Sequence, residues 1–351
     1  MLDAMLQLFE IVPDYDLDVM SDDQSPGQVM ATMLSNLEPI LREAKPDWVL
    51  VQGDTTTTAA AALSAFHQGM KVGHIEAGLR TGDKWQPFPE EINRRIVSLI
   101  ADLHFAPTER SRQSLLSEAV RDDHIVVAGN SGVDALHWVL RQPSPPQVDA
   151  LLDEIGLSGN SKRQNGQPDS VANPSSRSSQ PKIILVTAHR RENFGQRLSN
   201  ICDALREIAA RYQGNVHIIY PVHPNPNVSG PVYRTLGDVP GITLVPPLDY
   251  LSMSHLASRS YLIMTDSGGL QEEAPSLGKP VLVLREVTER PEGVAAGTSL
   301  LVGTETDQIV RATVCLIDDA RAYHEMSSKV NPYGDGRASG RILQALLDYS
   351  G

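Results

Sequence analysis

Short apolar runs recur along the chain, separated by amphipathic or mixed segments. They fall at 48–52, 71–76, 103–106 and 125–128, and again at 183–187, 216–222, 242–245, 261–265 and 280–284. Runs of this length that are rich in Val, Ile and Leu are typical of parallel strands buried on both faces, with helices as the connections between them. The pattern therefore predicts an α/β protein of two doubly wound, Rossmann-like domains that face each other across a cleft.

A polar segment marks the expected junction of the two domains. From 158 to 181 nearly every residue is Ser, Asn, Gln, Gly, Pro, Lys or Arg, so this segment buries too little apolar surface to offset its ordering entropy. We predict an N-terminal domain over 1–157, a disordered insertion over 158–181 and a C-terminal domain over 182–335. The amphipathic pattern within 336–351 predicts a helix that returns to the N-terminal domain.

Composition excludes several classes of protein. The 351 residues include 30 Lys and Arg against 43 Asp and Glu, and the formal net charge of −13 repels nucleic-acid phosphates. The apolar runs fall short of the ~20 residues that a membrane helix needs, and the start lacks a secretory signal pattern. Cys202 and Cys315 fit small core residues of a reduced compartment. We expect a soluble, cytoplasmic protein that binds neither nucleic acid nor membranes.

Carboxylates follow the apolar runs of the first half. Asp54 comes directly after 48–52, and Glu76 opens the sequence Glu-Ala-Gly-Leu-Arg-Thr-Gly-Asp after the next run. Ligands of open α/β sheets bind beyond the carboxyl ends of the strands, so both side chains are candidates for acid or base chemistry. A helix cap for Asp54 and an ion pair between Glu76 and Arg80 are the alternative interpretations.

Glu90 is a third candidate, because it lies at the start of a predicted helix. Glu90 and Arg94, and likewise Glu91 and Arg95, have the i, i+4 spacing of exposed ion pairs, which is the alternative to a catalytic role. Taken with the two strand-end carboxylates, Glu90 gives one domain enough groups to supply both an acid and a base.

Basic residues suited to a phosphate occur in the second half. His189 opens a His-Arg-Arg sequence after 182–188, and an imidazole with two guanidiniums suits an anionic leaving group. Arg290 is a further loop cation. His223 follows the next predicted strand, where a lone histidine is more often structural than ligand-binding.

The strongest local signal follows the run 261–265. A strand, a turn at Ser267, Gly268 and Gly269, and a helix start present backbone N–H groups to a phosphate, although plain chain reversal is the alternative. Glu273, six residues past Ser267, is suited to hold the ribose hydroxyls of a nucleotide. Neither a Walker loop nor a Gly-x-Gly-x-x-Gly sequence occurs, which argues against a nucleotide triphosphatase or a dinucleotide enzyme.

Over nearly its whole length the sequence resembles the non-hydrolysing UDP-N-acetylglucosamine 2-epimerases of bacteria. The matching segments include Gly-Asp-Thr-Thr-Thr-Thr at 53–58, Gly-His-Ile-Glu-Ala-Gly-Leu-Arg-Thr-Gly-Asp at 73–83, Pro-Glu-Glu-Ile-Asn-Arg at 89–94, His-Arg-Arg-Glu-Asn at 189–193, and Thr-Asp-Ser-Gly-Gly at 265–269. The resemblance implies a glycosyltransferase-B fold and interconversion of UDP-GlcNAc and UDP-ManNAc for polysaccharide biosynthesis. It also implies a homodimer that uses neither a cofactor nor a catalytic metal.

The same resemblance implies the reaction route and the residues that serve it. UDP is eliminated to give a 2-acetamidoglucal and is then added back on the other face. Asp54, Glu76 and Glu90 would supply the acid and base groups, with the face on which each acts left open, and His189 would assist departure of the phosphate. The residues that would hold the UDP are Ser267, Gly268, Gly269, Glu273 and Arg290.

Two further residues have roles by resemblance. Arg94 would orient Glu90, contact substrate, or contact a second nucleotide sugar that activates the enzyme. His223 would belong to that regulatory site.

The sequence departs from the family pattern at its start. Family members open with a strand, a Gly-Thr-Arg-Pro-Glu turn, a helix and a second strand, which this sequence lacks. We therefore expect a truncated chain whose first sheet contains an unpaired gap, with low stability and weak activity. The alternative functions are a UDP-sugar glycosyltransferase of the same fold, a hydrolase that releases ManNAc, and an inactive truncated UDP-sugar-binding protein.

Overall fold

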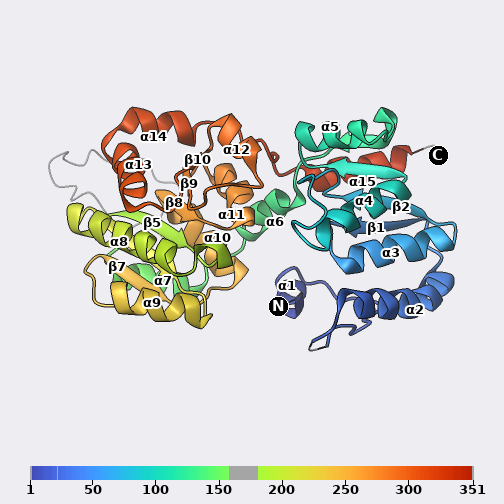
Figure 1. The fold of residues 1–351 in the computed structure, drawn as a ribbon, viewed down its shortest axis with the longest axis horizontal. Helices are drawn as coiled ribbons and strands as arrows, with labels where there is room; N and C mark the ends of the chain where they lie inside the picture. The colour runs from blue at the N-terminus through green and yellow to red at the C-terminus, as the bar shows by residue number, and fades with distance from the viewer. Residues whose placement is uncertain (1, 22, 158–180, 350–351) are drawn as a thin grey trace, which may run out of the picture. The chain divides into compact units, whose positions relative to one another are not determined.

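The computed structural model describes residues 2–21, 23–157 and 181–349, and the chain divides into two compact units. The first unit is Met1–Ala135 with Tyr333–Gly351, and the second is Leu136–Pro332. Each contains a parallel sheet with helical connections (Figure 1). The division falls before the expected boundary at 157. The expected insertion at 158–181 lies, apart from Pro181, outside the described residues, and the expected cleft stays a prediction.

The first unit contains a four-stranded parallel sheet in the order β1-β2-β3-β4 within its described residues. Its elements are α1 (Leu2–Leu8), α2 (Pro26–Ala44), β1 (Trp48–Gln52), α3 (Thr56–His67), β2 (Lys71–Ile75), α4 (Glu90–Ile100), β3 (Leu103–Ala106), α5 (Glu109–Ser117), η1 (Asp122–His124), β4 (Ile125–Val127), the start of α6 (Ser131–Val139), and α15 (Ala338–Asp348). Each of these strands is hydrogen-bonded to the next in sequence. The expected gap was therefore wrong for the described strands, since β1 pairs with β2 along its whole length and forms an edge.

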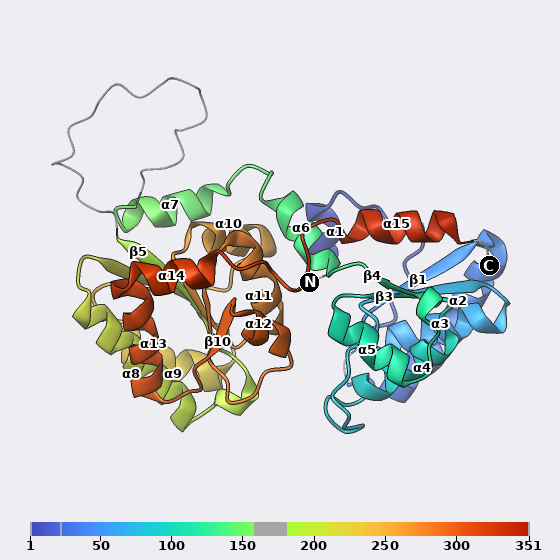
Figure 2. The same ribbon diagram turned by 90° about the horizontal axis from the view of Figure 1, so that it is seen from above.

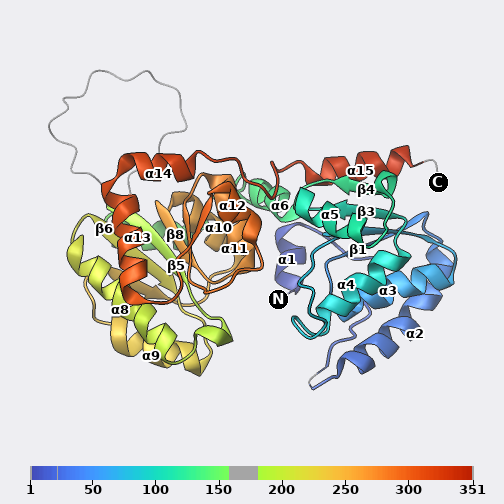
Figure 3. The ribbon, with the colours of Figure 1, turned by 45° about the horizontal axis from the view of Figure 1, so that its top comes forward.

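Helices cover both faces of this sheet, which is why its strands read as uninterrupted apolar runs. Val97 of α4 packs with Val72 of β2 on one face, and Leu115 of α5 extends that layer toward β4. On the other face, Ile342 of α15 packs against Phe105 of β3 (Figure 2). Helix α2 packs onto α3 (Figure 3).

The second unit contains a six-stranded parallel sheet in the order β10-β9-β8-β5-β6-β7 within its described residues. Its elements are the end of α6, α7 (Pro146–Glu154), β5 (Lys182–Thr187), η2 (Arg191–Asn193), α8 (Gln196–Arg211), β6 (Val216–Pro221), α9 (Pro226–Leu236), β7 (Ile242–Val245), α10 (Tyr250–Arg259), β8 (Leu262–Thr265), α11 (Gly268–Glu273), η3 (Ala274–Leu277), β9 (Val281–Val283), α12 (Pro291–Ala296), β10 (Ser299–Leu301), α13 (Thr306–Asp318) and α14 (Ala320–Ser327). None of the helices that the structure describes is both long and apolar enough to cross a membrane.

Alternating side chains along β5 build two cores in this unit. Ile184 and Val186 face α8, α9 and α13, whereas Ile183 and Leu185 face α7 and α10 (Figure 2). Because both faces are covered, successive side chains must all be apolar, as the sequence pattern predicts. The helices cover the two faces of the sheet, and polar side chains gather at the carboxyl ends of the strands.

Candidate functional site

An ion-paired network lies beyond the carboxyl end of β1 in the first unit. Arg94 donates from Nε and Nη2 to Asp54 Oδ2 at 2.8 and 2.7 Å. It also donates from Nη1 to Glu91 Oε2 at 3.1 Å, and Asn93 donates to the backbone carbonyl of Asp54 at 2.9 Å. Arg94 therefore orients Asp54, whereas the sequence interpretation assigned it to Glu90, to the substrate or to a second nucleotide sugar.

Glu91 belongs to this network, although the sequence interpretation gave it no role. Its side chain is fully buried and accepts the N–H groups of Thr81 and Gly82 at 3.1 and 3.2 Å. Burial opposes ionisation of Glu91, but these N–H groups and Arg94 outweigh burial and lower its pKa. The expected contact with Arg95 is present at 3.4 Å, but it involves a buried carboxylate and not a solvated pair.

The chain turns sharply at Glu76, directly after β2. Glu76 has a φ of 64°, a left-handed conformation that is uncommon for a residue with a Cβ and that often marks functional sites. A Cβ at Gly53 would lie 3.4 Å from Glu76 Oε2, so this carboxylate lies against the backbone that follows β1. A Cβ at Gly78 would lie 2.2 Å from the Ser111 carbonyl oxygen, which explains the glycine in this turn.

Glu90 is the first residue of α4. The arginines expected to pair with Glu90 and Glu76 bind other carboxylates instead. Arg94 turns away from Glu90, and Arg80, the alternative partner of Glu76, contacts Glu118 at 2.7 Å. Glu90 Oε2 is buried and has no hydrogen-bond partner among the residues that the structure describes. Because an unpaired buried oxygen costs free energy, this oxygen is suited to a ligand or a transferred proton.

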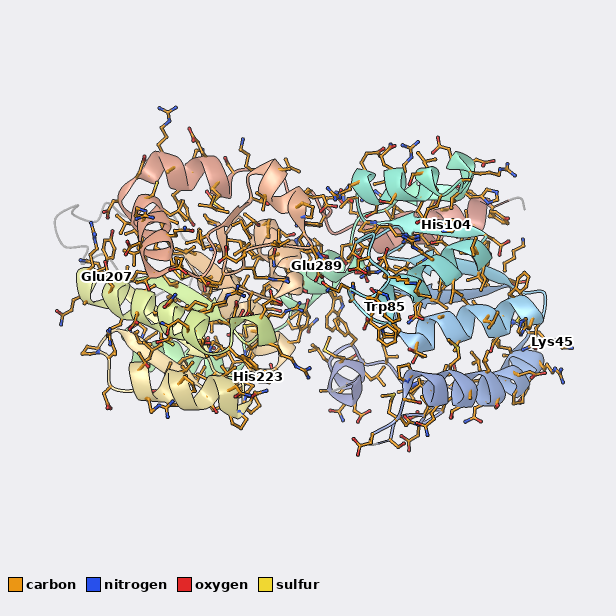
Figure 4. All side chains as sticks on the ribbon, in the orientation of Figure 1. Lys45, Trp85, His104, Glu207, His223 and Glu289 are labelled. Carbon is orange, nitrogen blue, oxygen red and sulfur yellow. The ribbon has the colours of Figure 1, made fainter. Side chains whose placement is uncertain are left out.

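Two buried histidines accompany these carboxylates. His74 on β2 is the register partner of His104 on β3, which is labelled in Figure 4. His74 Nε2 donates a hydrogen bond to the Gly53 carbonyl oxygen at 2.8 Å. Burial is the largest cause that lowers the pKa of each imidazole to about 4. Both are therefore neutral at neutral pH and add no cation to the site.

The second unit has a pocket of about 300 Å³ at the carboxyl ends of its strands. The strand order reverses between β5 and β8, and this switch point is where open α/β sheets bind ligands. The expected residues that line the pocket are His189, His223, Ser267, Gly269 and Glu273. The remaining lining residues, which the sequence interpretation did not single out, are Thr187, Pro221, Pro247, Leu248, Tyr250, Met253 and Leu270.

Asp266, fully buried after β8, fixes the loop that carries His189. Its Oδ2 accepts the N–H groups of His189 and Arg190, both at 2.8 Å, and the side-chain amide of Asn193 at 3.0 Å. The His189 ring stacks on His223, which lies between β6 and α9 (Figure 4), with 5.4 Å between ring centroids. Burial lowers the pKa of His189, the Asp266 charge opposes this, and the neighbouring His223 and Arg190 add to the lowering.

Two guanidinium groups converge on Gly268, the first residue of α11. A Cβ built on Gly268 would lie 3.8 Å from Nη2 of both Arg190 and Arg290. Arg290 is also paired with Glu272. Gly268 and Arg290 do not line the pocket themselves, but they adjoin Ser267, which does. Two guanidinium groups beside the backbone of a glycine are suited to bind the oxygens of a phosphate.

Glu273 is the carboxylate of the pocket. Tyr250 Oη donates to Glu273 Oε1 at 3.3 Å. Burial raises the pKa of Glu273 to about 7, with Tyr250 opposing the rise and the charge of Glu272 adding to it. Within the described ranges, His, Cys, Asp and Glu side chains form no group of three or more that could hold a metal ion.

The family model described as UDP-N-acetylglucosamine 2-epimerase matches residues 1–347. The chain belongs to the UDP-N-acetylglucosamine 2-epimerase family. The family member from Salmonella typhimurium is 52% identical over 349 residues, which are 99% of this chain and 88% of that relative. The Escherichia coli K12 member is 50% identical over 346 residues, covering 99% of this chain and 87% of the relative.

Solved structures of epimerases agree with this assignment. The enzyme from Neisseria meningitidis, solved bound to UDP-GlcNAc, matches with a TM-score of 0.81 and 44% identity, over 99% of this chain and 89% of that one. Membership of the epimerase family confirms the resemblance drawn from the motifs, the isomerase class, and the α/β fold of the glycosyltransferase-B type.

Proposed function

We propose that this chain interconverts UDP-GlcNAc and UDP-ManNAc by eliminating UDP and adding it back. In the first step a base takes the proton from C2 while the C1–O bond to UDP breaks, which leaves a C1=C2 double bond in a 2-acetamidoglucal. In the second step an acid returns a proton to the opposite face of C2 while a UDP oxygen re-forms the bond to C1. One observation carries this proposal. The chain belongs to the epimerase family, and it has carboxylates at the strand ends of one unit and a pocket suited to phosphate in the other.

The chemistry explains why both kinds of group are needed. The C2 proton is not acidic in the substrate, because C1 is an acetal carbon and not a carbonyl. Departure of UDP makes C1 cation-like and so acidifies C2–H in the transition state. The reaction therefore requires carboxylates around the sugar and cations around the diphosphate.

In this proposal the first unit supplies the proton-transfer groups. Asp54, Glu76 and Glu90 act as acid and base around C2. The fork of Arg94 on Asp54 supports a fixed geometry for that carboxylate. The buried Glu90 Oε2, which has no hydrogen-bond partner within the described part of the chain, supports a role in receiving or delivering a proton. Preorganised groups of this kind require little rearrangement during the reaction.

The second unit, in turn, binds UDP and assists its departure. His189 donates to the leaving phosphate, and Arg190 and Arg290 beside Gly268 neutralise the diphosphate charge. Glu273 accepts the ribose hydroxyls. We further propose that the protein acts as a cytoplasmic homodimer, as its resemblance to the family implies.

Turnover in heavy water tests the reaction. Epimerisation through elimination must place deuterium at C2 of the recovered UDP-GlcNAc and UDP-ManNAc, which proton NMR detects as loss of the C2–H signal. Turnover that leaves C2 unlabelled would refute the route. Free UDP produced only with an added sugar acceptor would indicate a glycosyltransferase, and stoichiometric free ManNAc would indicate a hydrolase. Binding without turnover would indicate an inactive UDP-sugar-binding protein.

A further inference from the structure

Tyr250 lies in the pocket of the second unit and has no part in the function proposed above. It begins α10 and lines the pocket beside the apolar side chains of Leu248 and Met253. In the part of the chain that the structure describes, its hydroxyl is the donor that reaches the Glu273 side chain, at 3.3 Å from Oε1. Glu273 Oε2 is not engaged by this bond.

We propose that Tyr250 is a positioning residue for nucleotide binding. Its hydroxyl directs one oxygen of Glu273 and favours the carboxylate form, so that the other oxygen accepts a hydroxyl of the ligand's ribose. The inference rests on the proposed function, since it assumes that the pocket binds the UDP moiety.

The first turn of α10 is anchored in a way that fixes Tyr250. Asp249 caps the helix by accepting the N–H of Ser252 at 2.7 Å. Gln147 of α7 donates to the Asp249 carboxylate at 3.2 Å and to Ser252 Oγ at 2.5 Å. A capped helix start held by a second helix limits the movement of the backbone, and the tyrosine ring has only two side-chain torsions. The hydroxyl is thus presented to Glu273 before any ligand binds.

The Tyr250 hydroxyl affects the ionisation of Glu273. Burial raises the pKa of Glu273 to about 7, and the hydrogen bond from Tyr250 works against that rise. Burial also raises the pKa of Tyr250, so the phenol stays protonated and remains a donor. The other titratable neighbours are Glu272 on the same helix, paired with Arg290, and His189 and His223 across the pocket.

Loss of the hydroxyl would therefore raise the pKa of Glu273 further. Near neutral pH a larger fraction of the carboxyl group would be protonated, and a protonated oxygen offers a proton where the ribose hydroxyl needs an acceptor. At alkaline pH Glu273 would be ionised with or without the hydroxyl. The contribution of Tyr250 to affinity should therefore shrink as pH rises.

Calorimetric titration with UDP tests this in four proteins: unaltered, Tyr250→Phe, Glu273→Gln, and the double variant. Between about pH 6 and about pH 9, Tyr250→Phe should raise the Kd for UDP about 3- to 10-fold at neutral pH, with a smaller ratio at the alkaline end. In the Glu273→Gln background the same substitution should change the Kd less than about 2-fold. His189 and His223 are present in all four proteins, so their effect cancels in the ratios.

Two results would overturn the inference: a Tyr250→Phe ratio that is constant across pH, or an equal loss in the Glu273→Gln background. Either would mean that the hydroxyl acts independently of the ionisation of Glu273. Tyr233→Phe is the matched control, because Tyr233 is exposed on α9 and does not line the pocket, and its Kd should equal that of the unaltered protein. Failure of the unaltered protein to bind UDP would instead overturn the proposed function and this inference with it.

Discussion

At the strand exits of the first unit Asp54, Arg94 and Glu91 are bound to one another, whereas the second unit leaves a pocket at its strand exits. Arg94 joins Asp54 to Glu91, and the backbone N–H groups of Thr81 and Gly82 complete the set. In the second unit, the guanidinium groups of Arg190 and Arg290 approach the backbone of Gly268, next to a pocket of about 300 Å³.

This difference indicates different functional roles for the two sheets, which share the same parallel α/β design. A carboxylate held by a buried fork keeps one orientation, which suits proton transfer at a fixed carbon. A cavity lined by histidines, a serine and apolar side chains suits reversible binding of a nucleotide. Substitutions in the first unit should therefore change the rate of the chemical step, and substitutions in the second unit should change affinity.

The largest effect is expected for Glu90→Gln, which removes a proposed proton-transfer group and keeps the side-chain size. We expect kcat to fall about 10²- to 10⁴-fold, while the Kd for UDP changes less than about 2-fold. An NMR assay of epimerisation and calorimetry with UDP measure the two quantities. Glu109→Gln, at an exposed position of the same unit, is the control and should retain full activity. A loss of UDP affinity as large as the loss of kcat would break the comparison.

Arg94→Met should destabilise the first unit by about 3–5 kcal/mol, because it removes the buried guanidinium from the fully buried Glu91, which keeps only the longer contact with Arg95, and from the partly exposed Asp54. Hydrogen exchange followed by mass spectrometry over β1 and α4 measures the local opening free energy. Arg95→Met removes a neighbouring guanidinium that is 46% exposed and should cost less than about 1 kcal/mol. Equal costs for the two variants would show that the network of Arg94 is not structural.

Sequence alone predicts most of the fold, because strands buried on both faces leave uninterrupted apolar runs. The nine runs correspond to β1 through β9, with small differences at their ends. The strand β10 (Ser299–Leu301) escaped prediction, since it is a short edge strand on which Leu300 is 45% exposed. The pairing of β1 with β2 was also not foreseen, because an apolar run does not specify its neighbour.

For the candidate site, the sequence identified candidate residues but not the pairs that they form. Strand-exit positions identified Asp54 and Glu76 because ligands of parallel sheets meet those ends. The i, i+4 rule assigned Arg94 to Glu90, yet Arg94 reaches Asp54, forty residues earlier in the chain. Residue spacing identifies only ion-pair partners on the same helix. Which face of the helix is buried is decided by its packing against the rest of the unit. The i, i+3 spacing of Glu91 and Arg94 was the signal that could have revealed the network.

Acid should weaken the first unit through its buried histidines. The pKa values of His74 and His104 lie near about 4 when folded, against 6.5 for an unperturbed imidazole. Between these values the unfolded chain binds more protons, so stability is full above about pH 6.5 and is lost as pH falls toward about 4, by up to about 3 kcal/mol for one imidazole.

Hydrogen exchange over β2 and β3 at a series of pH values measures this loss. His104→Leu should remove a large part of the pH dependence, in addition to a constant offset from the lost side-chain contacts. His67→Leu, which replaces an exposed imidazole on α3, should leave the pH dependence unchanged. A slope in His104→Leu equal to that of the unaltered protein would assign the acid sensitivity to the carboxylates of the network instead.

The smallest effect is expected for Ser267→Ala in the second unit. The Ser267 hydroxyl lines the pocket and makes no hydrogen bond within the described chain, so its removal should not affect folding. Loss of one hydrogen bond to a phosphate oxygen should raise the Kd for UDP about 3- to 10-fold, with kcat changed less than about 2-fold at saturating substrate. Ser328→Ala, at an exposed serine that ends α14, is the matched control. A fall in kcat that exceeds the change in Kd would place part of the chemical step on the second unit, and the separation of the two roles would not hold.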